Sequence, residues 1–188
     1  RSPQRGQRSS QGPRWRSTTR VTSRGTVEQS VGAVAWTTLA RAMRTQAVVT
    51  HLRCNQRCSY CTARRAEDDL AWIQAAAVRR RVDDALRGGA EELVLTGGEP
   101  TQRGDLPSLV AYARAQGARA VTLETNGTLL DAARATALRD AGLSRAVVNL
   151  AGWGDALDAV TSDPGGSERT LAGVEALLAA GLRVELRA

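Results

Sequence analysis

The stretch QAVVTHLRCNQRCSYC, residues 46–61, places three cysteines directly after a short apolar segment. Residues 47–52 are predicted to form a strand, because apolar and β-branched side chains dominate them. Cys54, Cys58 and Cys61 follow at spacings of four and three residues and are the only cysteines in the chain. A disulfide would leave one of the three thiols unpaired. The spacing therefore favours a loop that wraps three thiolates around one inorganic centre.

The rest of the chain repeats one arrangement, a short apolar segment followed by an amphipathic segment that ends at glycine. This alternation is typical of βα units and a parallel sheet. Asp105 and Ser167 are each expected to cap the start of a helix. The further strands are predicted at residues 92–96, 120–124, 145–150 and 183–187. The helices are predicted at residues 67–87, 105–117, 130–141 and 167–181.

Periodicity alone leaves two folds open, a doubly wound open sheet and part of a (β/α) barrel. A parallel strand that ends the chain at Ala188 without a covering helix would leave a sheet edge exposed. The sequence is therefore expected to be a fragment of a longer protein. Residues 151–166, which contain Trp153 and an Asp-Pro-Gly-Gly turn, are expected to form a surface loop close to the site.

The composition indicates a globular protein, with 188 residues and 42% hydrophobic content. No apolar run approaches the roughly 18 residues that span a bilayer, and no signal peptide is recognisable, so a cytoplasmic protein without membrane contact is expected. The net charge of +7 comes from residues 1–45, which hold nine arginines and one acid, Glu28. Residues 46–188 are nearly neutral, so nucleic acid is not an expected partner.

Residues 1–45 are expected to lie outside the folded domain, which comprises residues 46–188. Residues 1–24 are rich in Ser, Gln, Gly, Pro and Arg, which predicts disorder. A basic arm for nucleic acid is the alternative, but its only aromatic residue is Trp15. Because Met43 is the only methionine, a start of translation at that residue is a third interpretation.

Two metal centres are compatible with the cysteine triplet. Zinc would need a fourth protein ligand, and His51 is the only histidine, but structural zinc sites usually pair two knuckles far apart in sequence. An iron-sulfur cluster held by three thiolates would leave one iron open to a cofactor or substrate. For His51 itself, packing in or beside a strand is favoured over metal ligation.

The CxxxCxxC pattern, with Tyr60 before its last cysteine, resembles the signature of the radical S-adenosylmethionine superfamily. Two further segments strengthen this resemblance, Gly-Gly-Glu-Pro at residues 97–100 and Glu-Thr-Asn-Gly at residues 124–127. The resemblance implies a partial (β/α)6 barrel, here truncated after the fifth strand. It also implies that Cys54, Cys58 and Cys61 ligate a [4Fe-4S] cluster whose fourth iron is chelated by S-adenosylmethionine.

The resemblance further implies a set of cofactor contacts at the ends of successive strands, where barrel active sites assemble. The 97–100 segment would bind the methionyl amino group, the segment of Tyr60 would lie against the adenine, and Asn149 would reach the ribose. Taken singly, the glycines and Asn126-Gly127 are also common turn signals. The complete set of implied cofactor-binding residues is Tyr60, Gly97, Gly98, Glu99, Pro100, Glu124, Thr125, Asn126 and Asn149.

By this resemblance the protein cleaves S-adenosylmethionine reductively to a 5′-deoxyadenosyl radical that abstracts hydrogen from a substrate. No catalytic side chain is assigned, because the radical belongs to the cofactor. An external flavodoxin-like or ferredoxin-like electron donor is expected, with a peptide or small molecule as substrate. Arg187 is interpreted as a solvated charge, with the cofactor carboxylate as its alternative partner. The competing interpretation of the whole chain is a non-enzymatic protein, either zinc-structured or an electron carrier.

Overall fold

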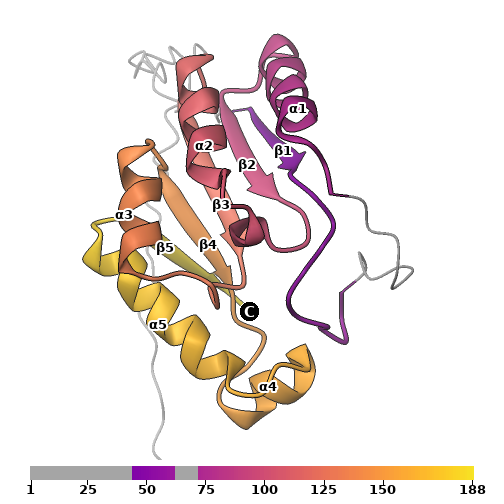
Figure 1. Ribbon diagram of the computed structural model, residues 1–188, viewed down its shortest axis with the longest axis vertical. Helices are drawn as coiled ribbons and strands as arrows, with labels where there is room; N and C mark the ends of the chain where they lie inside the picture. The colour runs from indigo at the N-terminus through magenta and orange to yellow at the C-terminus, as the bar shows by residue number, and fades with distance from the viewer. Residues whose placement is uncertain (1–43, 62–71) are drawn as a thin grey trace, which may run out of the picture. The chain divides into compact units, whose positions relative to one another are not determined.

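The computed structural model describes residues 44–61 and 72–188, and within them five parallel strands form one sheet (Figure 1). The strands pair in the order of the sequence, β1-β2-β3-β4-β5, which confirms the predicted parallel α/β fold. Consecutive parallel strands next to one another require a crossover after each strand. The strands are β1 Thr45–Val49, β2 Glu92–Thr96, β3 Ala120–Thr125, β4 Arg145–Asn149 and β5 Arg183–Arg187.

The crossover helices form a layer against one face of this sheet (Figure 1). Inward residues such as Leu93, Leu95 and Leu123 are fully buried beneath them, and each buried leucine contributes about 1.5–3 kcal/mol. Val82 of α1 and Leu109 of α2 close the core from the helix side. The helices are α1 Ala75–Arg87, η1 Pro100–Gln102, α2 Leu106–Ala115, α3 Ala132–Asp140, α4 Asp155–Thr161 and α5 Gly166–Ala179.

The opposite face of the sheet is polar at the amino ends of the strands. The Arg145 guanidinium donates to Glu92 at 3.0 Å and to Glu185 at 3.0 Å. Glu92 also accepts hydrogen bonds from the hydroxyls of Thr45 and Thr122. Successive residues of a strand therefore point alternately to the apolar helix layer and to this polar network, because side chains in a strand alternate between its two faces.

The first helix is shorter than predicted. Residues 72–74 precede α1, which begins at Ala75, because Trp72 stacks on His51 and the carbonyl of Ile73 accepts a hydrogen bond from Arg103. The predicted acidic first turn, residues 67–69, lies outside the described residues. The predictions about disorder and translation of residues 1–43 likewise lie outside them.

Asp105 occupies the predicted N-cap position of α2, whereas the predicted cap of α5 at Ser167 is wrong. Asp105 makes no capping hydrogen bond, because both of its carboxylate oxygens accept from Arg103. Ser167 is buried within the first turn of α5, where its hydroxyl accepts from the amide of Gly154. The amide of Ser167 instead donates to Asp158 at 2.7 Å, so α4 supplies the cap of α5.

The interpretation of residues 151–166 as a surface loop is also wrong in part, because α4 forms within them. Leu157 and Thr161 are buried on one side of this helix, while Trp153 before it is exposed. The helix ends at Ser162, which adopts the left-handed conformation with φ 51°. In the described part of the chain, no helix is long and apolar enough to cross a membrane.

Candidate functional site

The predicted site residues gather at one edge of the sheet, where the carboxyl ends of the strands meet (Figure 1). The cysteine segment, residues 54–61, leaves β1, and the glycine pair leaves β2. Thr125 ends β3 and Asn149 ends β4. Parallel pairing places these strand ends together, which is why residues far apart in sequence can share one site.

The three cysteines are free thiols on one loop, with Cys54 and Cys61 exposed and Cys58 half-buried. Partial dehydration raises the pKa of Cys54 to about 11, with further contributions from the charges of Glu99 and the other two cysteines. Dehydration likewise raises the pKa of Cys58. The cysteines therefore lie close enough to influence one another, and without a bound cation Cys54 holds its proton at neutral pH.

These residues fit an iron-sulfur cluster by the chemistry of their donor set. Within residues 44–61 and 72–188, no three His, Cys, Asp or Glu side chains are already arranged as a metal site. Three free thiols on one loop are nonetheless the ligands that such clusters use. His51 is fully buried and stacked on Trp72, which matches the packing role favoured from the sequence.

Gly97 and Gly98 allow residues 51–53, which lead into the cysteine segment, to approach the end of β2. The amide of Gly98 donates to the carbonyl of His51 at 2.8 Å, and the amide of Glu99 donates to the carbonyl of Arg53 at 2.8 Å. A Cβ atom would lie 2.1 Å from the His51 carbonyl oxygen at Gly97 and 1.9 Å from the Arg53 carbonyl oxygen at Gly98. Gly97 also has a positive φ of 140°. The glycine pair thus holds in place the residues that lead into the cysteine segment.

Glu99 is turned into the protein and is 1% exposed. Its carboxylate accepts from the amide and hydroxyl of Thr101, at 2.9 and 2.6 Å. It also accepts from the hydroxyl of Thr125 and the amide of Asn126, both at 2.7 Å. Burial raises the pKa of Glu99, and these hydrogen bonds oppose the shift. Glu99 therefore joins the end of β2 to the end of β3.

Replacement of Glu99 by glutamine is expected to lower the free energy of unfolding by about 2 kcal/mol. The glutamine amide group would present N–H donors where the carboxylate now accepts, so at least one buried donor would lose its partner. Urea denaturation of the metal-free protein measures this loss. Glu175→Gln on the exposed side of α5 is the matched control and should change stability by less than about 0.5 kcal/mol. Equal stabilities of the two variants would contradict the role assigned to Glu99.

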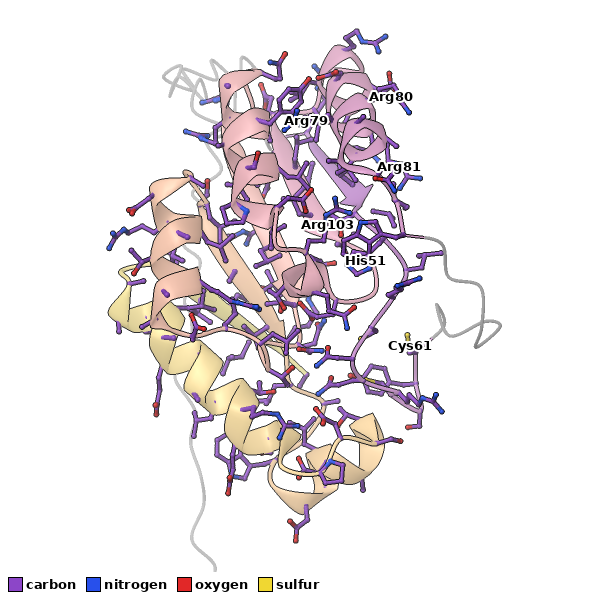
Figure 2. The ribbon with its side chains drawn as sticks, in the orientation of Figure 1. His51, Cys61, Arg79, Arg80, Arg81 and Arg103 are labelled. Carbon is purple, nitrogen blue, oxygen red and sulfur yellow. The ribbon has the colours of Figure 1, made fainter. Side chains whose placement is uncertain are left out.

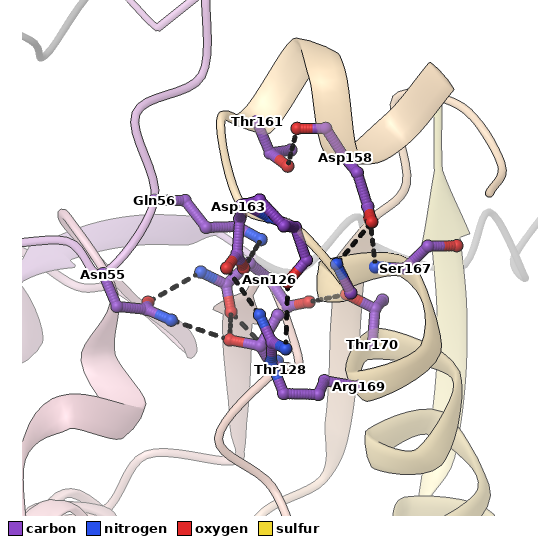
Figure 3. A network of polar contacts seen from close by, with 12 residues as sticks. Asn55, Gln56, Asn126, Thr128, Asp158, Thr161, Asp163, Ser167, Arg169 and Thr170 are labelled. Carbon is purple, nitrogen blue, oxygen red and sulfur yellow. Dashed lines mark hydrogen bonds and ion pairs between the residues drawn. The ribbon is translucent and has the colours of Figure 1, made fainter. Parts of the chain in front are cut away.

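Asn126 ties the end of β3 to the cysteine segment (Figure 3). Its side-chain oxygen accepts from the amide of Thr128 at 3.0 Å and from the Thr128 hydroxyl at 2.8 Å. Its side-chain nitrogen donates to Asn55 at 3.0 Å and lies 4.0 Å from the sulfur of Cys54. Asn55 in turn donates to Thr128 at 2.8 Å. The turn at Asn126 and Gly127, where φ is 79°, is thus also a contact to the loop that carries the thiols.

The remaining predicted residues at this edge of the sheet differ in their exposure and in their contacts. Tyr60 is 54% exposed, and partial dehydration together with Cys58 raises its pKa to about 12. Asn149 is exposed at the tip of β4. Pro100 is buried in η1. Glu124 forms an ion pair of 2.7 Å with Arg187, whose side chain is 52% exposed, so Arg187 is a solvated charge that also has a partner within the protein.

The hydrogen bonds by which α4 supports the cysteine segment were not predicted from the sequence. The amides of Arg57 and Ser59 donate to the carbonyls of Thr161 and Val160, both at 2.9 Å. The acids Asp155 and Asp158 in the first turn of α4 were a signal that could have revealed this helix.

A second contact joins the same loop to the start of α5. The side chain of Gln56 donates to Asp163 at 3.0 Å, and Asp163 is paired with Arg169 (Figure 3). Between them, α4 and the turn before α5 hold the residues that lie between Cys54 and Cys61.

A family profile described as the Radical SAM superfamily matches residues 48–187 of this chain. The Fe-coproporphyrin III synthase of Methanosarcina barkeri is 37% identical over 139 residues, which cover 72% of this chain and 34% of that protein. The GTP 3′,8-cyclase of Xanthomonas axonopodis pv. citri is 39% identical over 142 residues, which cover 69% of this chain and 41% of that protein. The chain therefore spans between a third and a half of the length of these relatives.

Solved structures share the fold of this chain. One of them, native anSMEcpe with bound AdoMet, superimposes with a TM-score of 0.62 at 17% sequence identity, covering 76% of this chain and 43% of that one. The similarity supports the predicted partial barrel. The predicted cofactors, a [4Fe-4S] cluster and S-adenosylmethionine, are those that the superfamily uses. From residue 48 to residue 187, this chain belongs to the radical SAM superfamily.

Proposed function

We propose that this chain is the part of a radical SAM enzyme that binds the cluster and S-adenosylmethionine. The observation that carries the proposal is a loop with three free thiols. Hydrogen bonds at the glycine pair hold this loop at the end of β2, and the side chain of Asn126 holds it at the end of β3. When bound, the reduced cluster would supply the electron that cleaves S-adenosylmethionine and yields the radical for hydrogen abstraction.

The protein's own residues have two roles in this proposal. Cys54, Cys58 and Cys61 are the proposed cluster ligands. The backbone at Gly97 and Gly98, together with Tyr60, Asn149 and Glu124, is proposed to contact S-adenosylmethionine from the carboxyl edge of the sheet. The side chains of Glu99, Thr125 and Asn126 are occupied by hydrogen bonds within the protein. We therefore assign these three side chains to positioning the loop.

The proposed substrate is a small organic molecule rather than a peptide. The relatives that support this choice are a coproporphyrin-related synthase and a GTP cyclase, at 37% and 39% identity. The structural neighbours are more distant in sequence. The proposed electron donor is a flavodoxin-like or ferredoxin-like protein, and the proposed location is the cytoplasm.

Anaerobic reconstitution with iron and sulfide tests the proposal. The chain is expected to bind about four irons, and addition of S-adenosylmethionine is expected to change the electron paramagnetic resonance spectrum of the reduced cluster. Reduction with dithionite should then release 5′-deoxyadenosine, measured by chromatography. Stoichiometric zinc, with neither a spectral change nor 5′-deoxyadenosine, would establish the non-enzymatic alternative.

A further inference from the structure

Arg103 is a buried cation that binds two carbonyls on opposite sides of the cysteine segment. Its side chain is 1% exposed. One guanidinium nitrogen, Nη1, donates to the carbonyl of Thr50 at 3.2 Å and to the carbonyl of Ile73 at 2.7 Å. Thr50 and Ile73 flank the stretch of chain that carries all three cysteines. A single side chain therefore joins the two ends of this stretch.

The guanidinium is fixed in this position from its other side. Nε and Nη2 donate to the two carboxylate oxygens of Asp105, at 2.8 and 2.7 Å. This bidentate arrangement sets the plane of the guanidinium as well as its position, because two parallel hydrogen bonds leave it little freedom to rotate. Asp105 thereby aims Nη1 at the two carbonyls, which explains why its carboxylate does not cap α2.

A stack of rings adds a second connection between the same two ends of the chain. The rings of His51 and Trp72 lie 4.6 Å apart at an interplanar angle of 27°, and the Arg103 guanidinium lies 4.8 Å above the Trp72 ring. Figure 2 shows Arg103 and His51 where the cysteine segment leaves β1, with Cys61 farther along it.

The environment of His51 suits a neutral ring in this stack. Among the described residues neither ring nitrogen makes a hydrogen bond of normal geometry. Burial and the charges of Arg103 and Arg53 lower the pKa of His51, while backbone groups of Glu99 and Arg53 oppose the shift. A neutral imidazole can lie beside the Arg103 cation without repulsion.

We propose that Arg103 is a positioning residue for the cluster: by bridging Thr50 and Ile73 it fixes the end of β1 from which the cysteine segment, residues 54–61, departs. This inference rests on the proposed function, because it assumes that the loop holds a cluster. A cluster is held less firmly when the segment that carries its ligands can move, so fixing the chain at Thr50 is expected to slow the release of iron. Residues that orient metal ligands without touching the metal typically affect metal affinity 10–100-fold, by order of magnitude.

A purely structural role for Arg103 makes a different prediction. It would change the stability of the fold and leave the bound cluster as it is. The matched comparison is Arg145, which is also held by two carboxylates but lies at the amino ends of the strands, opposite the cysteine edge. Arg145→Gln therefore removes an ionic network, with an arginine that is 40% exposed, at a distance from the cysteine segment.

The test compares reconstituted wild type with Arg103→Gln, Arg103→Lys and Arg145→Gln. Arg103→Gln is expected to release iron to a chelator about tenfold faster than wild type and to broaden the spectrum of the reduced cluster with S-adenosylmethionine. The rate of iron release from Arg103→Lys should lie between those of wild type and Arg103→Gln, because an ammonium can still donate to the carbonyls but cannot bind Asp105 bidentately. Arg145→Gln should match wild type in both measurements. Equal iron release from Arg103→Gln and Arg145→Gln would overturn the inference.

Trp72→Leu provides an independent arm in case Arg103→Gln fails to fold. It removes the ring over which the Arg103 guanidinium lies and which stacks on His51, so the hold of Arg103 on this end of the chain is weakened without changing Arg103 itself. Iron release from Trp72→Leu is expected to be faster than from wild type, and a rate equal to that of Arg145→Gln would count against the inference. If wild type itself takes up no cluster, the proposed function fails. If wild type loads normally and the variants match Arg145→Gln, only the inference about Arg103 fails.

Discussion

Replacement of Cys58 by serine is expected to reduce iron uptake during anaerobic reconstitution from about four atoms per chain to background. Cys58 is the middle ligand of the proposed site and the only one of the three cysteines that is half-buried. Its sulfur lies 3.8 Å from the side-chain oxygen of Gln56, which Asp163 holds in turn. A serine hydroxyl does not ionise readily enough to replace a thiolate at iron, and two remaining thiolates cannot enclose a cubane cluster.

Iron and sulfide analysis, with the spectrum of the reduced protein, measures this loss. Ser59→Ala is the matched control, because Ser59 is the adjacent exposed residue and its contact to α4 is made by its backbone amide. The control should load iron as wild type does. A complete [4Fe-4S] spectrum from Cys58→Ser would remove Cys58 from the proposed ligand set.

Replacement of Gly98 by alanine is expected to destabilise the protein by about 3 kcal/mol and to prevent normal cluster loading. The added Cβ would lie 1.9 Å from the carbonyl oxygen of Arg53 and 2.6 Å from that of Leu52. Both are backbone atoms, so no rotamer change can relieve the overlap. The cysteine segment would have to move away from β2, with loss of the hydrogen bonds that the amides of Gly98 and Glu99 now donate to it.

Thermal and urea denaturation measure the first effect, and iron content after reconstitution measures the second. Gly104→Ala is the control, since a Cβ at Gly104 meets no atom within 4 Å and its φ is not in the left-handed region. It should be as stable as wild type and load fully. If Gly98→Ala also loads fully, the glycine pair does not hold the loop in its binding conformation.

The sequence left two interpretations of the glycine pair open, a turn and a close approach to a ligand. The structure adds a third, close packing between two parts of the chain. The nearest neighbours of Gly97 and Gly98 are the carbonyls of His51 and Arg53, within the segment that leads into Cys54. The pair is therefore required by packing between two pieces of the chain. A contact of its backbone with S-adenosylmethionine remains part of the proposed function.

The α4 helix shows where local patterns failed. Its seven residues are too few for a clear amphipathic stripe, and the Asp-Pro-Gly-Gly turn that follows suggests a loop. The role of α4 depends on tertiary contacts, since its last carbonyls accept hydrogen bonds from the amides of Arg57 and Ser59. These partners are about a hundred residues earlier in the chain, and no pattern within a short window reports them.

By itself the sequence determined the parallel sheet, the order of its elements and the placement of three thiols on the loop after the first strand. It could do so because the strand and helix periods and the cysteine spacing are local properties. Only the tertiary structure decided that Glu99 faces inward, that Asp158 rather than Ser167 caps α5, and that Arg103 joins Thr50 to Ile73. These contacts depend on buried polar groups finding partners, and the partners come from other βα units: Glu99 bonds Thr125, 26 residues away, and Arg103 bonds Thr50, 53 residues away.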